Sequence, residues 1–375
     1  MTARPDDILI VGGGVIGCAL AAELATRGQR VTVIERGEPG LEASGAAAGM
    51  LTPQAEAHRR DGLFDLALES RNLYPQWAGA LFEETGIDVG YRRTGILQCV
   101  FGEPGGQRLL PAYAWQCAAG LPVEEYSPAQ LRRCLGGRLS PEVGEAVFFP
   151  DDAVVDPRRL MLALALAARR RGVRLRTGTA ARRFLVRDGV CRGVETEEGP
   201  IEAKAVVDAA GAWAAFDRDL APPPPVAPVR GQIVELSIPD QPLPSVVSSD
   251  EVYLVPRPDG TVLLGSTLEL VGFRKGVTAE AVQRLIAAAV RLVPSLKAAR
   301  FVSAWSGLRP GTTDGLPVLG RSPVPGLFYA TGHYRNGILL APVTARILAD
   351  LLTGGSERDL SAFSISRFAG SLGAV

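Results

Sequence analysis

Histidine and cysteine are scarce in this chain of 375 residues, which holds two histidines and five cysteines. The histidines, His58 and His333, are too few for a His-based metal site, and the cysteines form no C-x-x-C pair. An odd number of scattered cysteines favours reduced thiols in the cytoplasm over a disulfide scaffold, a zinc site or an iron–sulfur cluster. We therefore expect a cytoplasmic protein that holds no metal.

An excess of charge is also missing, because 40 Lys and Arg residues balance 40 Asp and Glu residues. A nucleic-acid partner usually needs a basic face, so this balance argues against one. No apolar run reaches the roughly 18 residues needed to span a bilayer. The longest, residues 160–168, has the size of a helix and follows Asp156-Pro157. The N-terminus lacks the pattern of a signal peptide, so we expect no membrane span.

What the chain does have is a globular composition, with 47% hydrophobic and 21% charged residues. Its first segment alternates strand and helix. Residues 8–11 form an apolar run that predicts a buried strand, and residues 12–17 form a glycine-rich turn. Apolar residues then recur at helical spacing up to Gly28, and residues 30–34 predict a second strand. This pattern is the opening of a doubly wound α/β fold.

Further elements follow from the same signals of periodicity and turns. Asp188-Gly189 predicts a hairpin turn, and Pro258-Asp259-Gly260 predicts another tight turn. Pro75 predicts a kink or break inside a helix. The prolines at 222–225 fit neither a helix nor a central strand, so we place a domain crossing there. Strands are expected at residues 182–187, 190–197, 206–209, 232–236, 251–255, 261–265 and 327–331, and helices at residues 64–82, 157–171, 282–290 and 338–352.

The glycine-rich turn, Gly12-Gly13-Gly14-Val15-Ile16-Gly17, fits the G-x-G-x-x-G pattern in the strand–helix context that this pattern requires. Gly12 allows the tight turn, Gly14 lets the backbone approach a pyrophosphate, and Gly17 lets the helix pack on the strand. The helix start supplies N–H groups and a partial positive charge for phosphates. Glu35 ends the second strand, where a carboxylate can accept hydrogen bonds from ribose hydroxyls. The sequence therefore predicts a dinucleotide site.

This motif alone does not separate NAD from FAD. Residues 44–50 are small and nearly free of side chains, which suits the close passage of a large cofactor, although the same composition fits a flexible loop. Their position after Glu35-Arg36 favours FAD. The last helix opens at residues 332–342, and the start of a helix stabilises nearby negative charge such as that of a reduced flavin.

That last stretch, with residues 305–312 and 253–257, resembles the glycine oxidases of thiamine biosynthesis, which lie within the wider group of D-amino-acid and sarcosine oxidases. Residues 46–51 and Arg230-Gly231-Gln232 match in order as well, so the resemblance covers nearly the whole chain. The C-terminal stretch is the specific part, because many folds share the N-terminal glycines.

The resemblance implies roles for three side chains at the substrate. Arg309 would clamp the substrate carboxylate, since a guanidinium offers it two parallel donors. Tyr253 would donate to the same carboxylate, and Arg335 would lie close to substrate and flavin together. By residue type alone, the arginines also fit surface ion pairs and Tyr253 fits core packing. We do not favour His333 as a general base, and two segments, around Glu251 and at residues 268–275, are expected to line the substrate pocket.

The resemblance also implies a bound FAD. We expect it to be non-covalent, because sarcosine oxidases attach flavin through a C-terminal cysteine and no cysteine follows Cys191 here. The residues expected to hold the cofactor are Gly12, Gly14, Val15, Ile16, Gly17, Glu35, Arg36, Ala43, Ser44, Ala48, Gly49, Met50, Ala181, Ala210, Gly211, Trp213, Gly332, His333, Tyr334, Arg335, Asn336, Gly337, Ile338 and Leu339.

The implied activity is oxidative deamination of glycine and similar small amines such as sarcosine and small D-amino acids. A hydride would pass to flavin N5, O2 would be reduced to H2O2, and the imine would supply thiazole formation in thiamine biosynthesis. The resemblance suggests a homo-oligomer, commonly a tetramer. Three alternatives stay open: a dehydrogenase of a D-amino acid or sarcosine that reduces a quinone, the flavin subunit of a heteromeric amine dehydrogenase and, more distantly, an NAD-dependent dehydrogenase.

The expected fold class is therefore α/β, with two domains. A Rossmann-like FAD-binding domain would be discontinuous, over residues 1–85, 140–220 and 320–375. Residues 86–139 and 221–319 would form an α+β substrate domain built on an antiparallel sheet.

Overall fold

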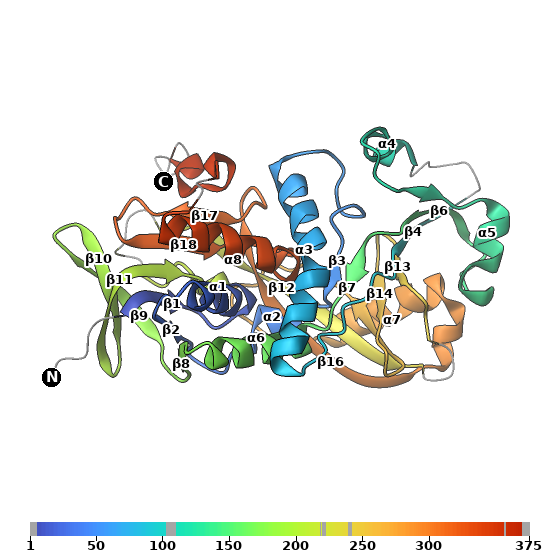
Figure 1. Ribbon diagram of the computed structural model, residues 1–375. Helices are drawn as coiled ribbons and strands as arrows, with labels where there is room; N and C mark the ends of the chain where they lie inside the picture. Colours follow the sequence, from blue (N-terminus) through green and yellow to red (C-terminus); the bar gives the residue numbers. More distant parts are fainter. Residues whose placement is uncertain are drawn as a thin grey trace.

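The computed structural model describes residues 6–102, 110–217, 219, 223–238, 242–355 and 358–369. This part of the chain folds around two sheets of eight strands each, with a further sheet of two strands. Figure 1 shows the first large sheet on the left, the second on the right, and the long helix α3 (Gly62–Thr85) between them. The mixed α/β architecture expected from the sequence is confirmed.

The first sheet has the order β17-β18-β11-β1-β2-β8, with β10 and β9 continuing from β11 as an antiparallel extension. The run from β18 to β8 is parallel, and β17 is antiparallel to β18. Its strands are β1 (Asp6–Val11), β2 (Val31–Ile34), β8 (Arg174–Arg176), β9 (Ala181–Arg187), β10 (Val190–Thr196), β11 (Gly199–Asp208), β17 (Val318–Arg321) and β18 (Leu327–Thr331).

The second sheet has the order β16-β12-β15-β14-β13-β4-β6-β5. It is antiparallel as expected, except that β13 and β4 run parallel. Its strands are β4 (Ile96–Phe101), β5 (Glu124–Glu125), β6 (Val143–Phe149), β12 (Val226–Ser237), β13 (Val246–Ser248), β14 (Tyr253–Pro256), β15 (Thr261–Gly265) and β16 (Arg300–Thr312). The small sheet pairs β3 (Met50–Leu51) with β7 (Ala153–Val154).

The helices include those expected near residues 64–82, 157–171, 282–290 and 338–352. The α-helices besides α3 are α1 (Val15–Thr26), α2 (Ala43–Ala46), α4 (Leu110–Ala118), α5 (Pro128–Arg133), α6 (Pro157–Arg170), α7 (Ala279–Leu292) and α8 (Gly337–Thr353). The 3-10 helices are η1 (Cys134–Gly136), η2 (Gly211–Trp213), η3 (Pro294–Ala298), η4 (Ser361–Phe363) and η5 (Ile365–Phe368).

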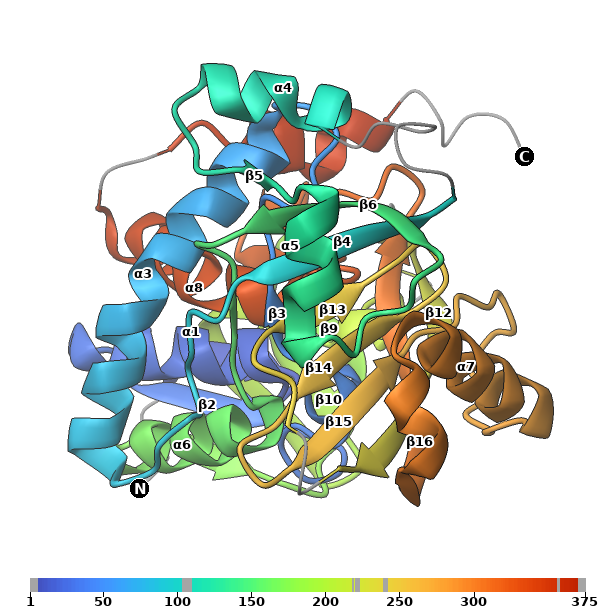
Figure 2. The same ribbon diagram turned by 90° about the vertical axis from the view of Figure 1, so that its right-hand side faces the viewer.

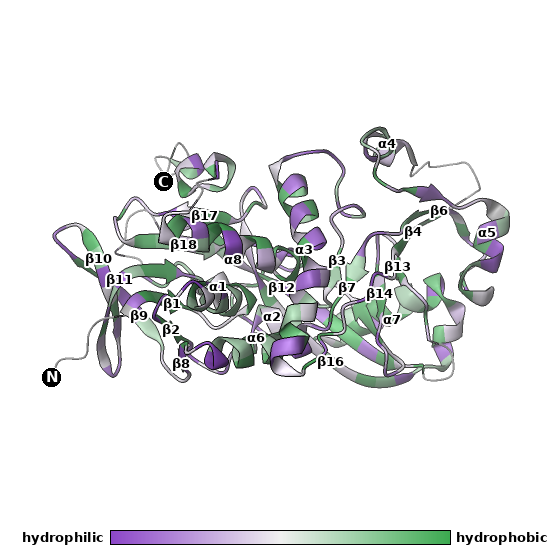
Figure 3. Ribbon diagram, viewed as in Figure 1, coloured by the Kyte–Doolittle hydropathy of each residue, from purple (hydrophilic) through white to green (hydrophobic). Residues whose placement is uncertain are grey.

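The apolar run at residues 8–11 is buried on both faces of β1. Ile8 and Ile10 pack into the core formed with α1, α3, α6 and α8. Leu9 and Val11 pack on the opposite side, against β9, β10 and η5. Burial on both faces explains why the strand is a continuous apolar run rather than an alternating one. In Figure 3 much of β11 and β18 is accordingly green, whereas the exposed hairpin of β9 and β10 also carries purple residues.

The structure corrects two expectations about helix and strand boundaries. Of the kink or break expected at Pro75, the break is wrong, because helix α3 continues through this residue. Proline removes one backbone hydrogen bond, but the neighbouring Tyr74 is fully buried and its hydroxyl donates to the Ile338 carbonyl, which holds α3 against α8. Strand β6, assigned to the cofactor domain by the boundary at residue 140, lies in the second sheet because it pairs with β4.

The expected hairpin and the second turn are both present. Asp188 and Gly189 have positive φ angles of 51° and 74°, which suits the tight turn that joins β9 to β10. Residues 257–260 join β14 to β15. The expected domain crossing lies partly outside the described residues, because the boundary at 220/221 and Pro222 fall in the gap; β12 begins at Val226.

The second sheet presents its two faces to different surroundings. Helices α5 and α7 cover one face, as Figure 2 shows, and Leu236, Leu254 and Leu264 point into that core. The other face carries Ile233 and Trp305 and looks toward the first sheet. Because side chains alternate along a strand, Arg309 lies on the same face of β16 as Trp305. Trp305 and Arg309 therefore face the turns of the first sheet at which its helices begin.

Candidate functional site

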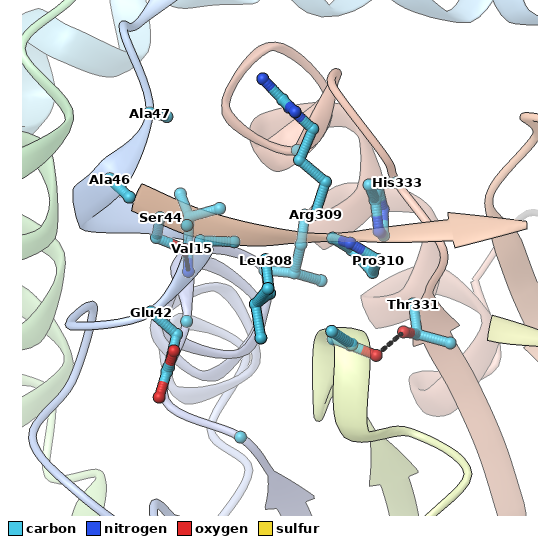
Figure 4. Close-up of a pocket in the computed structure, with 18 of the residues that line it drawn as sticks. Val15, Glu42, Ser44, Ala46, Ala47, Leu308, Arg309, Pro310, Thr331 and His333 are labelled. Carbon is cyan, nitrogen blue, oxygen red and sulfur yellow. Dashed lines mark hydrogen bonds between the residues drawn. The ribbon is translucent and has the colours of Figure 1, made fainter. Parts of the chain in front are cut away.

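A cavity of about 430 Å³ lies where the two sheets face each other. From the first sheet it is lined by the turns after β1, β2, β11 and β18, and from the second by β12, β14 and β16. Figure 4 shows Val15 and Ser44 on one side, with Arg309 and Leu308 extending in opposite directions from β16. We call the part around Gly12 and Gly14 the glycine side and the part around Arg309 the arginine side.

On the glycine side, glycines stand where one backbone segment passes close to another. The lack of side chains at this turn suits an extended nucleotide. Gly12 has a φ of +109°, and a Cβ there would overlap the Ala209 carbonyl. A Cβ on Gly17 would overlap the Gly12 carbonyl, so Gly17 serves helix packing. Helix α1 points its N-terminus at this turn and carries no acidic residue in its first turn. Such an N-terminus favours a phosphate.

Glu35 and Ser44 fix this turn from outside. The Glu35 carboxylate accepts from Gly13 N at 2.7 Å and from Gly37 N at 2.9 Å. Each carboxylate oxygen has a second lone pair, so Glu35 retains acceptor capacity toward the cavity that it lines. Ser44 Oγ accepts from Val15 N at 2.9 Å, at the start of α1.

Residues 43–50 are ordered by contacts from the second sheet and are not a loose loop. Trp305 Nε1 donates to the Ala46 carbonyl at 3.0 Å, and Arg257 Nη2 donates to the Ala48 carbonyl at 2.8 Å. These bonds hold helix α2 and its continuation along the cavity wall. The small side chains thus leave a smooth surface that is fixed in position.

Arg36 and Trp213 form a side wall of the cavity. The guanidinium carbon of Arg36 lies 3.7 Å from the centroid of the Trp213 ring, and Nη2 pairs with Glu42 at 2.6 Å. A cation over an indole is a favourable stack. Both residues were expected to contact the cofactor, and both line the cavity.

On the arginine side, three glycines on the cavity-facing side of the second sheet make a shallow hollow. A Cβ on Gly231 would overlap the Arg309 guanidinium, and one on Gly265 would overlap the Tyr253 ring. A Cβ on Gly307 would come within 2.6 Å of Ala46 Cβ. The absent side chains are the reason why Arg309 and Tyr253 can lie along the sheet.

The Arg309 guanidinium is held by two acceptors from the segment after β15. Its Nη2 donates to Ser266 Oγ at 2.6 Å, and its Nη1 donates to the Thr267 carbonyl at 3.1 Å. A guanidinium has five N–H donors, so these two bonds leave donors for a ligand in the cavity. No carboxylate pairs with Arg309 among the described residues, and the neutral partners leave its charge uncompensated.

Tyr253 lies beside this guanidinium. Burial raises the pKa of its hydroxyl, while contact with Ser266 and the positive charge of Arg309 oppose that rise. The phenol therefore stays protonated near neutral pH and can donate a hydrogen bond.

Arg335 pairs with Glu56 across the cavity opening, with Nη2 and Oε2 at 2.8 Å. Thr52 Oγ1 donates to the other oxygen of Glu56 at 3.1 Å. Both members of the pair also line an adjoining cavity of about 280 Å³, together with Tyr253 and Glu251. Glu251 thus lies near the site as expected, but residues 268–275 line neither cavity.

His333 is buried, with 3% of its surface exposed, and its Nε2 lies 3.2 Å from Thr344 Oγ1. Burial lowers the pKa of its imidazole to about 3. The ring therefore stays neutral at physiological pH and shapes the wall, next to Thr331, whose hydroxyl donates to the Gly211 carbonyl at 3.0 Å (Figure 4).

Most residues expected at the site line the main cavity. Three do not: Gly17 and Gly332 pack against backbone or side chains elsewhere, and Leu339 is buried in the core between α3 and α8. Those that line it are Gly12, Gly14, Val15, Ile16, Glu35, Arg36, Ala43, Ser44, Ala48, Gly49, Met50, Ala181, Ala210, Gly211, Trp213, Tyr253, Arg309, His333, Tyr334, Arg335, Asn336, Gly337 and Ile338.

Sequence reasoning missed Glu56 and Ser266, which both line the cavity, and gave no role to Gly231. Glu56 follows the small-residue segment with no recognisable pattern. The place of Ser266 follows only from the pairing of β15 with β12 and β14. In that pairing the preceding residue, Gly265, lies opposite both Ile233 and Tyr253.

In the described part of the chain, no group of three or more His, Cys, Asp or Glu side chains could hold a metal ion. Within those same residues, no helix has both the length and the apolar character to cross a membrane. All five cysteines are free.

Comparison with known proteins gives consistent matches over nearly the whole chain. Residues 7–351 match the family described as FAD dependent oxidoreductase. Glycine oxidase from Geobacillus kaustophilus is 39% identical over 373 residues and 98% of each chain is covered. The crystal structure of glycine oxidase from the same organism superposes with a TM-score of 0.92 at 38% identity, covering 97% of this chain and 99% of that one.

A second kind of relative is longer. The bifunctional protein ThiO/ThiG from Trichormus variabilis is 40% identical over 375 residues, which cover 96% of this chain but 55% of that protein. The chain therefore spans about half the length of these curated relatives.

Proposed function

Because the chain belongs to the FAD dependent oxidoreductase family and is an enzyme that uses FAD, we propose that it oxidises glycine and similar small amines, sarcosine and small D-amino acids among them. O2 is the acceptor, H2O2 is formed, and the imine serves thiazole formation for thiamine. The observation that carries the proposal is a guanidinium in the cavity, Arg309, which has only neutral partners.

The arginine side suits an amino acid's acid group. Arg309 supplies the charge and the three N–H donors that its two protein acceptors leave over, and Tyr253 supplies a hydroxyl on the same face of the sheet. A charged, forked donor fixes the direction of a carboxylate as well as its position. Arg335 has its charge offset by Glu56, so Arg309 is the stronger anchor.

The glycine side suits the cofactor, which is bound without a covalent link. The turn after β1 would hold the phosphates at the start of α1, Glu35 would accept from the ribose, and the start of α8 would stabilise negative charge on a reduced flavin. The chemistry that FAD supplies when bound is acceptance of a hydride from the substrate α-carbon, with reoxidation by O2 to H2O2.

The chain's own contribution is positioning. Once Arg309 has fixed the substrate carboxylate, the cavity would hold the substrate α-carbon within reach of the flavin. Good alignment of the reacting groups by itself accelerates a reaction strongly. The amine must reach the reaction as the neutral form, so that its lone pair can form the imine. His333 is buried and neutral, and it is not needed as a base.

The proposal extends to assembly and location. We propose a homo-oligomer, such as a tetramer, as the resemblance noted in the sequence implies. Five free thiols suit the reducing cytoplasm.

The test is a visible spectrum of the purified holoenzyme, followed by glycine under anaerobic conditions. We expect an oxidised-flavin band that bleaches with glycine, and one H2O2 for each glycine after air is admitted. A band that bleaches only with D-proline would reassign the substrate. Turnover with a quinone or dye but none with O2 would make the protein a dehydrogenase.

A further inference from the structure

The triplet Arg230-Gly231-Gln232 has no place in the reaction described so far. It lies on β12, next to the strand that carries Arg309. Gln232 is 1% exposed and Arg230 is 8% exposed, so two polar side chains are buried beside the cavity without touching it. Burial of polar groups is costly unless their hydrogen bonds are made, so both side chains need hydrogen-bond partners inside the protein.

Both side chains converge on Glu269, in the segment that follows β15. Arg230 Nε donates to Glu269 Oε2 at 2.6 Å, and Gln232 Nε2 donates to Glu269 Oε1 at 2.7 Å. The backbones of Arg230 and Glu269 also exchange N–H···O bonds of 2.9 and 3.0 Å. One carboxylate is thereby tied to two alternate positions of β12, Arg230 and Gln232.

Gln232 secures both ends of the same segment. Its backbone N donates to Thr267 Oγ1 at 2.9 Å, and its side-chain Oε1 accepts from Thr278 N at 2.8 Å, at the start of α7. The segment 266–278 is therefore bound to β12 at Thr267 and Glu269, near its beginning, and at Thr278, its end.

That segment supplies both acceptors of Arg309. Ser266 Oγ and the Thr267 carbonyl fix the two terminal nitrogens, and Gly231 leaves the space in which the guanidinium lies. Glu269 meanwhile neutralises Arg230, whereas Arg309, which lines the cavity, has no carboxylate partner among the described residues.

We propose that Arg230, Gly231, Gln232 and Glu269 are positioning residues that set the direction of the Arg309 guanidinium before a carboxylate arrives. This rests on the proposed role of Arg309 as the carboxylate anchor. Preorganisation of this kind stabilises a complex by removing the cost of ordering a long side chain during binding. A loose Arg309 would still carry its charge but would lose the direction of its donors.

Gly231→Ala is the sharpest variant, because the new methyl group meets the guanidinium while the backbone network stays. We expect about 10–100-fold weaker binding of acetate to the holoenzyme by calorimetry, since small misplacements of a binding group have effects of this size. KM for glycine should rise in the same proportion, and bound FAD should stay at one per chain. Glu269→Gln should act in the same direction, by about 3–30-fold.

Gly311→Ala is the matched control. It lies on β16, and its new Cβ would come within 2.8 Å of Val229 Cγ2 rather than near the guanidinium. It should lower the melting temperature without changing acetate affinity. If Gly311→Ala and Gly231→Ala weaken acetate equally, the network is only structural.

A double-mutant cycle gives a readout that needs no activity. Gly231→Ala should lower the melting temperature in the wild-type background but not in an Arg309→Ala background, where the overlap is gone. Equal losses in both backgrounds, or wild-type acetate affinity in Gly231→Ala, would overturn the proposal. If instead glycine fails to bleach the wild-type enzyme while acetate binding shows this pattern, the oxidase assignment fails and the positioning role stands.

Discussion

On the glycine side of the cavity the turn at Gly12 and Gly14 offers backbone groups, whereas on the arginine side the sheet offers the long polar side chains of Arg309 and Tyr253. The glycine side depends on what is absent, since Gly12 must have no Cβ. The arginine side also needs glycines, but there Gly231 and Gly265 make room for side chains, whereas the missing Cβ of Gly12 makes room for the backbone of Ala209.

The comparison separates two ways of building a binding site. A turn between a strand and the helix that follows it is local, so six consecutive residues set its shape. The arginine side draws Tyr253, Ser266 and Arg309 from three strands or their ends, and only the register of the sheet brings them together. We expect changes on the glycine side to abolish cofactor retention and changes on the arginine side to spare it.

Gly12→Ala should have the largest effect. The methyl group would meet the Ala209 carbonyl in a backbone conformation that side chains rarely adopt. Overpacking costs about 1–3 kcal/mol and the unusual φ adds about 1–2 kcal/mol. We expect protein that retains almost no FAD after desalting, measured as the flavin-to-chain ratio.

Gly79→Ala is the control for that experiment, because a Cβ there meets nothing within 4 Å. It should keep its full complement of FAD. Full retention of FAD by Gly12→Ala would contradict the expectation that changes on the glycine side abolish cofactor retention.

Arg309→Ala should come next and act only on the arginine side. Loss of one partner of a buried charge pair typically costs about 3–5 kcal/mol, which corresponds to roughly two to four decades in kcat/KM. Flavin content should be unchanged. Arg346→Ala, on an exposed position of α8, is the control. Undiminished efficiency on glycine would falsify the assignment of Arg309.

Asp208→Asn tests the support behind the glycine side. Asp208 is fully buried at the end of β11, where Oδ1 accepts from Ala210 N at 2.9 Å and Oδ2 has no hydrogen-bond partner among the described residues. Burial raises its pKa to about 8. Since an unfolded Asp has a pKa of about 3.9, the native state binds this proton more tightly, and stability falls as pH rises from about 4 to 8.

The amide removes that dependence while keeping the bond to Ala210. We expect Asp208→Asn to gain roughly 2–5 kcal/mol over wild type at pH 9 and little at pH 4. Chemical denaturation at both pH values measures this. An equal change at both would mean that Asp208 does not titrate in the native state.

Tyr253→Phe should have the smallest effect, on the arginine side again. Removal of one hydroxyl donor to a carboxylate costs about 0.5–3 kcal/mol, so kcat/KM for glycine should fall by a few-fold to about a hundredfold. The FAD content and the melting temperature should not change. Steady-state kinetics on glycine measure this loss. A loss of FAD in this variant would contradict the separation of cofactor retention on the glycine side from substrate binding on the arginine side.

The same division explains how much the sequence could predict. The turn at residues 12–17 and the strand before it follow local patterns, and both are found where expected. Ser266 and Glu56 have no local signature, because their importance comes from chain segments that pair only in three dimensions. Strand β6 was assigned to the wrong sheet for the same reason, since only its pairing with β4 reveals its place.

The order of strands in the first sheet has a consequence for biosynthesis. Strand β1 lies between β2 and β11, and β11 in turn needs β18, which is Leu327–Thr331. The wall of the cavity is finished only by the start of α8. A nascent chain on the ribosome therefore displays its glycine turn long before the remaining walls exist. Because such distant pairings form slowly, we expect loading with FAD to await synthesis of the segment that holds β18 and α8.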